Sequence, residues 1–309
     1  MSIFPETEVI GVRPSNGNYE VMARRSTGVL HPKKTFQARG IVFSGGVMGS
    51  VPLLMKCKQE GWLPNVSDRL GDYVRTNSES ILTVDSADKS VDWNDQIAIT
   101  SGIYPDKSTH IEIVRYNKGS DVLFGLLTVL TDGGGQIPRQ LRLLGNVIRH
   151  PLQFLKALWL PGQAARNSVL LVMQSDENYL NFEYKRRWWR LGSHSVTSTV
   201  PPGQERVRSY IPVANEAARL MAKRMKGHPK TMWSEALLNG PTTAHILGGC
   251  AMAESPDKGV VNFSGEIFGY PNLYVADGSV VPANLAVNPS LTITALSEYI
   301  MSQVPSKTS

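Results

Sequence analysis

The sequence of 309 residues contains only two cysteines, Cys57 and Cys250, which lie far apart along the chain. Two cysteines exclude a disulfide scaffold and a cysteine-rich metal site, and they favour a reducing compartment. Long hydrophobic runs are also missing, because the longest, residues 122–130, is too short to cross a bilayer as a helix. No apolar segment follows Met1, so the sequence supports no export signal and we expect a cytoplasmic location.

A complete dinucleotide-binding glycine motif is missing as well. Residues 1–40 contain no G-x-G-x-x-G, the motif that binds the pyrophosphate of a dinucleotide between a strand and a helix. The nearest pattern is Gly45-Gly46-x-x-Gly49, which follows a predicted strand at 40–43 and opens a predicted helix. A tight strand-to-helix turn explains these glycines about as well as cofactor binding does, so both interpretations stay open.

The N-terminal region shows the alternation that is typical of antiparallel strands. Residues 6–43 predict a three-stranded meander, and its first two strands meet at Ser15-Asn16-Gly17-Asn18, where Asn-Gly is a strong turn signal. Short alternating runs between residues 81 and 116 predict antiparallel strands of a separate layer. This change of character indicates a domain boundary near residue 80.

Farther along, the sequence predicts a strand pair and a helix. Residues 168–176 and 178–190 each have strand character and are predicted to pair with each other. Trp188 and Trp189 stand among basic residues, a combination that can bind nucleic acid by stacking and phosphate contacts. No recognition fold accompanies them, so we expect no nucleic-acid partner. Residues 203–227 predict a helix that ends at a glycine.

Positive charge is concentrated in the middle of the chain. The net charge is +6, and between Arg139 and Arg190 nine Lys or Arg face three Asp or Glu. Within residues 139–160 an apolar stripe predicts an amphipathic helix pair, the second helix starting at Pro151. Such a pair can contact a membrane surface or, as amphipathic helices more often do, pack on the domain beneath. The stripe comprises Leu141, Leu144, Ile148, Leu152, Leu155 and Trp159.

The stretch 241–300 brings together three features that suit an anionic ligand. His245 lies in a polar, glycine-rich loop, and a short predicted strand at 273–276 runs into Asp277-Gly278-Ser279. Asn288-Pro289 precedes a predicted helix, with Asn288 suited to the N-cap and proline to the first helical position. The amino end of a helix presents unpaired N–H groups and a partial positive charge, which stabilise anions.

Each of these residues also has a purely structural interpretation. Asn288 can be a helix cap and nothing more, and a lone histidine such as His245 is more often structural than catalytic. A neutral imidazole in that loop could instead take a proton from a substrate hydroxyl, and the adjacent glycines would let a ligand approach. No second His or Cys lies at ligand spacing from His245, so no metal site is predicted. Cys250 is expected to be buried and inert.

Three segments resemble the glucose–methanol–choline (GMC) flavoprotein oxidoreductases. HILGGC at 245–250 and GEIFGYPNLYVADGSVVPANLAVNPSLTITALSE at 265–298 resemble the C-terminal signature of that family. Within it they are most similar to the cholesterol oxidase branch. The segment RGIVFSGGVMGSVPLLMKCKQEGWLPN at 39–65 is similar to the strand–glycine–helix run of the same branch.

The resemblance implies roles for particular residues. His245 matches the active-site histidine that faces the flavin and takes the proton of the substrate hydroxyl while hydride passes to flavin N5. Asn288 matches the residue that orients the alcohol oxygen. The implied FAD contacts lie at the adenosine half, along the ribityl and phosphate region, and at the start of the C-terminal helix. They are Gly45, Gly49, Asp277, Gly278, Pro289 and Ser290.

The resemblance also implies the fold class, an α/β plus α+β protein. It would be the C-terminal part of an FAD-binding Rossmann-like domain with an inserted antiparallel-sheet substrate domain. Residues 1–80 and 241–309 would then belong to the FAD-binding domain, and 81–240 to the substrate-binding domain. The implied activity is FAD-dependent oxidation of a hydroxyl group on a hydrophobic alcohol, with sterols as candidate substrates.

Two departures from the family leave alternatives open. Without the N-terminal motif for the FAD pyrophosphate, the chain could be a non-catalytic remnant or a subunit that an FAD-binding segment complements in trans. The cholesterol oxidase branch also uses a glutamate near its central strand as the base for double-bond isomerisation. Residues 167–174 contain no carboxylate, and the nearest downstream is Glu177. The sequence therefore puts isomerase activity, and cholesterol as the substrate, in doubt.

Overall fold

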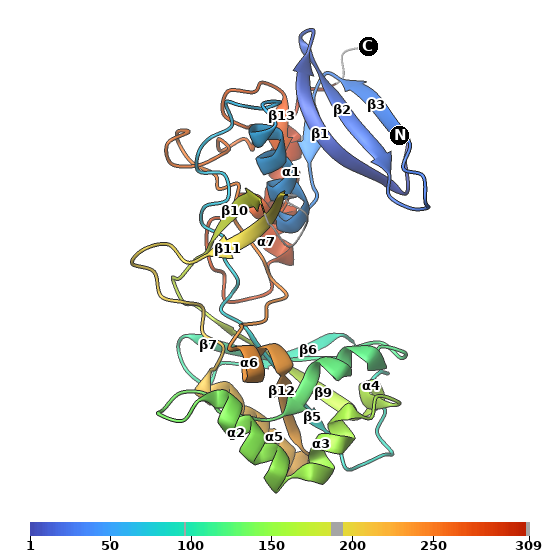
Figure 1. The fold of residues 1–309 in the computed structure, drawn as a ribbon, viewed down its shortest axis with the longest axis vertical. Coiled ribbons are helices and arrows are strands. Elements are labelled where there is room, and N and C mark those ends of the chain that lie inside the picture. Colours follow the sequence, from blue (N-terminus) through green and yellow to red (C-terminus); the bar gives the residue numbers. More distant parts are fainter. Residues whose placement is uncertain (96, 187–193, 307–309) are drawn as a thin grey trace.

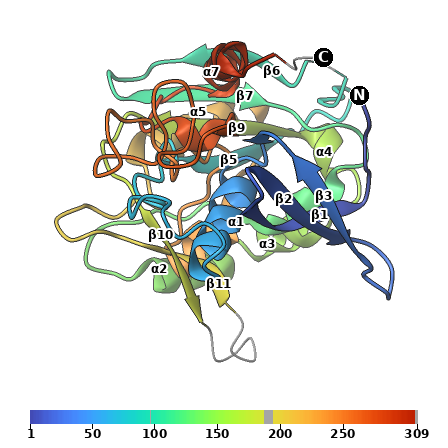
Figure 2. The ribbon, with the colours of Figure 1, turned by 90° about the horizontal axis from the view of Figure 1, so that it is seen from above.

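The computed structural model describes residues 1–95, 97–186 and 194–306, so Trp188 and Trp189 lie outside the described residues. Both termini lie at one end of the longest axis, together with the N-terminal strands (Figure 1). A larger sheet and most of its covering helices form the other end, and the view from above shows the two parts overlapping (Figure 2).

The N-terminal sheet is the predicted antiparallel meander. It consists of β1 (Thr7–Ser15), β2 (Asn18–Arg25) and β3 (Lys33–Ala38) in that order. Asn16 and Gly17 join β1 to β2 with φ of 49° and 77°. Positive φ at both central residues is the requirement of a type I′ hairpin turn, so the Asn-Gly prediction is confirmed.

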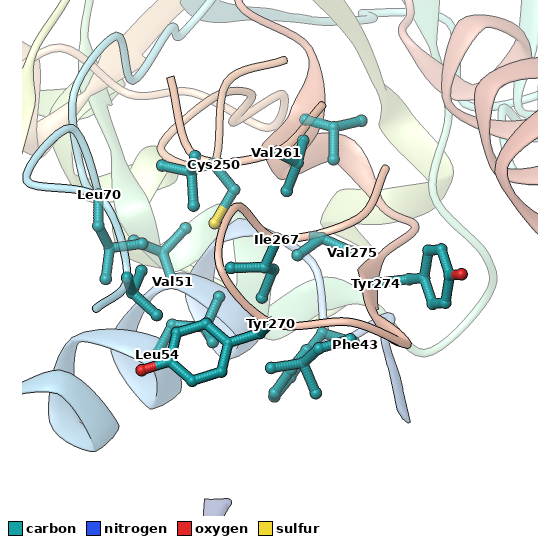
Figure 3. Close-up of a cluster of buried hydrophobic side chains, with 14 of the residues drawn as sticks. Phe43, Val51, Leu54, Leu70, Cys250, Val261, Ile267, Tyr270, Tyr274 and Val275 are labelled. Carbon is teal, nitrogen blue, oxygen red and sulfur yellow. The ribbon is translucent and has the colours of Figure 1, made fainter. Parts of the chain in front are cut away.

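The core at this end closes around a pair of parallel strands. β4 (Ile41–Phe43) pairs with β13 (Leu273–Val275), and α1 (Val47–Gln59) follows β4 through the glycine turn. Figure 3 shows the buried side chains between α1 and the C-terminal segments, among them Phe43 and Leu54. The helix α7 (Ser290–Gln303) contributes the fully buried Ile300. A mixed α/β architecture is confirmed, whereas the Rossmann-like identity of this part stays a prediction.

The second sheet has six strands, all antiparallel, as predicted for the separate layer. Its order is β6-β7-β9-β5-β12-β8. One face packs on α5 through the alternate residues Leu82, Leu170 and Val172, and the other face meets the short helix η1. The bounds of these elements are β5 (Ser80–Asp85), β6 (Ile99–Ile103), β7 (Thr109–Val114), η1 (Asp121–Leu126), β8 (Leu127–Val129), β9 (Asn167–Gln174), α5 (Pro212–Met225) and β12 (Pro229–Met232).

Two expectations from the sequence were wrong. β9 does not pair with the strand that follows it but lies between β7 and β5, while β10 (Asn181–Arg186) pairs with β11 (His194–Thr199). Every residue of β9 is buried, and a strand buried on both faces is satisfied best in the middle of a sheet. The predicted helix at 203–227 begins only at Pro212, because proline is favoured in the first turn and disfavoured inside a helix.

The amphipathic pair forms α2 (Arg139–Arg149) and α3 (Pro151–Leu158), and Pro151 starts the second helix as predicted. The two helices pack on β8 and, with the aromatic pair Phe154–Trp233, on α6 (Trp233–Leu238). The short helix α4 (Gln163–Arg166) leads into β9. Within the described residues, no helix has both the length and the apolarity needed to cross a membrane.

Glu235 on α6 is a buried acid beneath the sheet. Its carboxylate accepts hydrogen bonds from the hydroxyls of Ser80 and Thr231 and from the backbone N–H of Ile81. Burial nevertheless raises the pKa of Glu235 to about 7, from an ordinary value of 4.5. The folded state therefore retains a proton between these pH values that the unfolded chain releases.

This difference predicts a pH-dependent stability. As pH rises from about 4.5 to about 7, Glu235 should remove about 3 kcal/mol from the free energy of unfolding. We expect Glu235→Gln to abolish that loss, so that urea unfolding at pH 5 and pH 8 differs less than in the parent protein. The exposed Glu216→Gln is the matched control. An equal pH dependence in the parent and Glu235→Gln would contradict the prediction.

Candidate active site

His245 lies in the loop after α6, where its ring forms a short hydrogen bond through Nδ1 with Glu79 Oε1. The Glu79 side chain is fully buried, and its Oε2 accepts the backbone N–H of Ala244 at 2.5 Å. An ionised carboxylate only accepts hydrogen bonds, so the proton of the neutral ring belongs on Nδ1. Nε2 is then the nitrogen that can take up a proton. The ring is 16% exposed, which leaves it within reach of a ligand.

Asn288 does not cap α7 through its side chain, which corrects the expectation from the sequence. Its Nδ2 donates to Glu112 Oε2 at 2.7 Å instead. Pro289 is the residue before the helix, and its carbonyl accepts the N–H of Ile293 at 2.9 Å. A hydrogen bond to a buried carboxylate is stronger than one to a helix N–H that water can reach, so the amide turns toward Glu112.

One short segment, residues 76–79, connects the histidine loop to the loop before α7. The Thr243 hydroxyl donates to the carbonyl of Thr76 at 2.8 Å. Asn77 donates through Nδ2 to the carbonyl of Val287 at 2.9 Å and accepts the N–H of Leu285 at 3.3 Å. Together with the Glu79–His245 hydrogen bond, these contacts tie the two predicted catalytic residues to the same piece of backbone, which is buried.

Glu112 brings a carboxylate next to the central strand, although residues 167–174 themselves contain none. It lies on β7, directly opposite Leu171 of β9, so the acid belongs to the neighbouring strand and not to β9 itself. His110, on the same face, has Nδ1 3.6 Å from Glu112 Oε1 and stacks on Tyr104. The cluster thus combines a carboxylate, an imidazole and an amide on one face of the sheet.

Two buried atoms of this cluster have no hydrogen-bond partner among the described residues. They are Asn288 Oδ1 and His110 Nδ1. Buried polar atoms are almost always satisfied, by protein groups, by water or by a ligand. A water molecule or a ligand N–H would satisfy Asn288 Oδ1.

An apolar pocket of about 180 Å³ lies on the same face of the sheet. Ile81 of β5 and Val169 of β9 form its floor, and Leu123 and Leu126 of η1 line it as well. Thr242, in the histidine loop, also contributes to the wall. Two of the lining residues are therefore close in sequence to the predicted base and its partner. Ile81 is two positions from Glu79, and Thr242 is three positions from His245.

The predicted cofactor residues Gly45 and Gly49 line a larger cavity of about 690 Å³, which β1, β2, β4 and α1 surround. Between them, Gly46 has φ of 68°, which favours glycine. A methyl group on Gly49 would meet no atom within 4 Å, so a ligand can approach the turn there. These residues fit the edge of a large cofactor, as the resemblance implied for the adenosine half of FAD.

Asp277, just after β13, connects this turn to the end of that strand through side-chain hydrogen bonds. One oxygen accepts the N–H of Gly46 at 2.9 Å and the hydroxyl of Ser50 at 2.5 Å. The other accepts the N–H and the hydroxyl of Ser279 at 2.8 and 2.6 Å. Both oxygens of the Asp277 carboxylate are therefore hydrogen-bonded within the protein. A cofactor at this place would contact the backbone of the turn that these hydrogen bonds hold, and not the carboxylate.

The other three predicted cofactor residues lie near α7. A methyl group on Gly278 would come within 3.1 Å of both Ile293 and Leu247, so glycine permits close packing there. Pro289 is buried and Ser290, the first residue of α7, is exposed. Ser290 therefore remains available to a ligand at the amino end of a helix, whereas Gly278 is enclosed by protein.

Sequence reasoning missed Glu79 and Glu112. The stretch Thr76–Ser80 has the polar composition of an exposed loop, although the structure buries Asn77, Ser78 and Glu79. Glu112 carried a weak signal, because an acid between two isoleucines interrupts an apolar strand. A charge in such a position requires a partner, and here the partner comes from the far end of the chain.

Comparison with known proteins shows the family of the chain. A GMC oxidoreductase family model matches residues 186–297. The chain is 41% identical to a cholesterol oxidase of Acinetobacter baumannii over 99% of its own length and 55% of the relative's. It is 37% identical to a cholesterol oxidase of Mycobacterium tuberculosis, over 99% of the chain and 54% of that relative. The chain thus spans about half the length of the curated relatives it matches.

A solved structure gives the same picture at the level of the fold. The crystal structure of pyridoxine 4-oxidase from Mesorbium loti superimposes with a TM-score of 0.57 at 13% identity, covering 96% of this chain and 57% of that one. The sequence matches to the cholesterol oxidases cover 99% of the chain, and the fold match covers 96% of it. The chain belongs to the GMC oxidoreductase family, on its cholesterol oxidase-like branch, and corresponds to the C-terminal part of the family's sequence.

Proposed function

We propose that this chain supplies the substrate side of an FAD-dependent enzyme that oxidises a hydroxyl group on a hydrophobic alcohol. The observation that carries the proposal is the buried Glu79 held against Nδ1 of His245, in a segment whose Asn77 also hydrogen-bonds the loop that leads to Asn288. A base oriented by a carboxylate, together with an amide N–H that can donate to the oxygen losing its proton, is what deprotonation of an alcohol requires.

In this proposal His245 Nε2 accepts the hydroxyl proton, and Glu79 stabilises the imidazolium that forms. Asn288 Nδ2 donates one N–H to Glu112, and its second N–H would donate to the alcohol oxygen while the proton moves to His245. FAD, when bound, supplies the acceptor for the hydride that leaves the carbinol carbon. Ser290, at the amino end of α7, would offer its backbone N–H to that cofactor.

The apolar pocket defines the substrate class in chemical terms. Its lining of leucine, isoleucine, valine and aromatic side chains suits a hydrocarbon group. Its volume of about 180 Å³ is below the range of about 300 Å³ and more that drug-sized ligands occupy. It accommodates part of an alkyl chain or ring system, and a whole sterol would require η1 to move. Hydrophobic alcohols are therefore the proposed class, with sterols as its largest candidates.

Glu112 supports a second activity on the same substrate. Glu112 accepts a hydrogen bond from the Asn288 amide and lies 3.6 Å from His110 Nδ1, and such a carboxylate could shuttle a proton between carbon atoms next to a new carbonyl. Double-bond isomerisation after oxidation is thus an activity that the described residues could perform. If a steroid with a Δ5 double bond is oxidised, Glu112→Gln should leave the unconjugated ketone as the product.

The cavity beside β4 indicates how the cofactor site is completed. It runs along Ile41, Val42 and Phe43, and within the described residues β4 pairs with β13 alone. A strand and glycine turn from an N-terminal FAD-binding segment would add to this edge, in the same polypeptide or in trans. The alternative is a remnant that binds no FAD and has no activity.

An absorbance spectrum distinguishes these possibilities. The purified chain, with and without added FAD and an N-terminal FAD-binding segment, is passed over a gel-filtration column. We expect the flavin band to co-elute with the complemented protein and to bleach when a long-chain or sterol alcohol is added without oxygen. Retained flavin that no hydrophobic alcohol bleaches would contradict the proposed oxidation. Absence of flavin under all conditions would favour the inactive remnant.

A further inference from the structure

The helix α6 and the loop after it form one hydrogen-bonded unit that carries His245. Ser234 of α6 joins the loop twice, because its carbonyl accepts the N–H of Gly240 at 2.9 Å and its hydroxyl lies 2.7 Å from that of Thr242. The N–H of His245 then donates to the Thr243 hydroxyl at 3.0 Å. The helix lies where the chain passes from the six-stranded sheet toward the other end of the molecule (Figure 1). A displacement of α6 would therefore reach His245.

This unit meets the start of β5 at two neighbouring points. Glu79 binds the His245 ring, and Ser80, the next residue, donates its hydroxyl to the two carboxyl oxygens of Glu235 at 3.1 and 3.0 Å. The N–H of Ile81 donates to the same carboxyl at 3.2 Å. Consecutive residues of one strand therefore bind both α6 and the histidine loop, so a separation at Glu235 would also strain the contact between Glu79 and His245.

The surroundings of Glu235 favour its neutral form. The side chain is fully buried, and this burial raises its pKa to about 7. The hydroxyls of Ser80 on β5 and Thr231 on β12 can donate to the carboxyl or accept its proton. The charged group that faces it is Arg139 of α2, whose Nη1 donates to the Glu235 carbonyl at 2.9 Å. Arg139 also donates to two carbonyls outside α6, so other contacts already hold its guanidinium.

The remaining charged groups on the elements around α6 are directed elsewhere. On β12, Lys230 donates to a glutamine of α4, and on β5, Glu79 lies on the face opposite to Ser80. On α2, Arg142 donates to a carbonyl of the glycine run before the helix, and Arg149 is exposed. The strand β8, which also packs on α6, consists of uncharged residues. Loss of the Glu235 proton would thus leave a buried charge with little compensation.

We propose that Glu235 is a positioning residue for the Glu79–His245 pair, which holds α6 against the start of β5 while its carboxyl is neutral and releases it when the carboxyl ionises. A buried carboxylate gains hydration if α6 moves away from β5 and admits water. The histidine loop would move with α6, and the ring would lose the carboxylate that orients it. The effect on the base rests on the proposed function, whereas the opening of the contact does not.

The direction of the pH dependence follows from the shift. Because the pKa of Glu235 in the fold is about 7, the carboxyl is neutral below this pH and the contact between Glu79 and His245 is closed. Above it, the neutral share falls about tenfold for each pH unit, and the contact opens.

Proton NMR tests this in the purified chain, without flavin or alcohol. A proton between an imidazole nitrogen and a buried carboxylate resonates far downfield, and its absence in His245→Ala assigns the resonance. We expect the parent to lose it as pH rises through about 7. Glu235→Gln is neutral at every pH and should keep the resonance under conditions where the parent has lost it.

A second variant acts from the β5 side of the contact. Ser80→Ala removes the hydroxyl that binds Glu235 and should weaken the resonance already at pH 6. Ser168→Ala is the matched control, because Ser168 is also fully buried, on the neighbouring β9, and its hydroxyl has no hydrogen-bond partner among the described residues. Circular dichroism at each pH shows whether the proteins are folded.

The FAD-loaded, complemented enzyme tests the consequence for the base. The rate of flavin reduction by Glu235→Gln, divided by the parent rate at the same pH, should rise at least about 10-fold between pH 6 and pH 9. This ratio cancels the titration of His245, which both proteins share.

Several results would overturn the proposal. They are an equal pH dependence of the resonance in the parent and Glu235→Gln, a parent resonance that persists at pH 9, a loss that coincides with global unfolding, and a parent-like resonance in Ser80→Ala. A resonance that behaves as expected, in an enzyme whose flavin no hydrophobic alcohol reduces, would contradict the proposed function and support the role of Glu235.

Discussion

His245→Ala in the FAD-loaded, complemented enzyme should reduce the rate of flavin reduction by a hydrophobic alcohol about 10²- to 10⁴-fold, the usual contribution of a general base. The effect should fall on the rate constant and leave flavin binding unchanged. His245 makes its side-chain hydrogen bond to Glu79, and none of its hydrogen bonds joins it to the glycine turn that lines the larger cavity. Stopped-flow absorbance without oxygen measures the step directly.

His31→Ala is the control for this experiment, because His31 lies exposed in the loop between β2 and β3. It should reduce flavin at the parent rate. If His245→Ala also reduces flavin at the parent rate, the assignment of the base is wrong. If it loses flavin altogether, the residue supports the cofactor site and its catalytic role is not the one proposed.

Glu79→Gln should lower the turnover number about 10²- to 10⁴-fold with little change in KM. The glutamine can present its NH2 group to Nδ1 of His245, which would move the ring proton to Nε2. Nε2 would then have no lone pair for the substrate proton. Because Glu79 contacts the histidine and the Ala244 backbone, it acts as a positioning residue.

The ratio of the two kinetic parameters separates this role from a merely structural one. Glu177→Gln, at a side chain that is 96% exposed, should change neither parameter. A Glu79→Gln enzyme that keeps its turnover number and loses only substrate affinity would show that the carboxylate does not orient the base. Thermal unfolding of each variant shows whether the loss follows from a damaged fold.

The sequence was sufficient for features that neighbouring residues determine. The Asn16-Gly17 hairpin, the glycine turn before α1 and the start of α3 at Pro151 all depend on local backbone preferences, and the structure has them as predicted. The pairing of β9 depends instead on burial from both sides by β5 and β7. β9 and β10 follow one another in sequence but share no ladder, so the predicted pairing of 168–176 with 178–190 was wrong.

The site shows the same division. His245 and Asn288 were found by resemblance, because each stands in a distinctive local motif. Glu79 and Glu112 were not found, since their importance comes from partners 166 and 176 positions away. For Asn288 a local rule predicted a helix cap, but its side-chain amide donates a hydrogen bond to Glu112 on β7 instead. Residues whose role depends on contacts with distant parts of the chain therefore could not be predicted from the sequence.

The parallel pairing of β4 with β13 has a consequence for the order of folding. Ser44 and Ala276 follow the ends of β4 and β13 and are linked by a hydrogen bond, although they are 232 positions apart in the sequence. Closing such a loop in an unfolded chain costs about 5 kcal/mol of conformational entropy. If the intervening six-stranded sheet is already folded, the loop that remains to be closed is shorter and the entropic cost is lower. We therefore expect the six-stranded sheet to form first and the β4–β13 core last. During synthesis on the ribosome, Phe43 and Leu54 would therefore stay exposed until most of the chain had been synthesised. We expect chaperones to bind this region during that time.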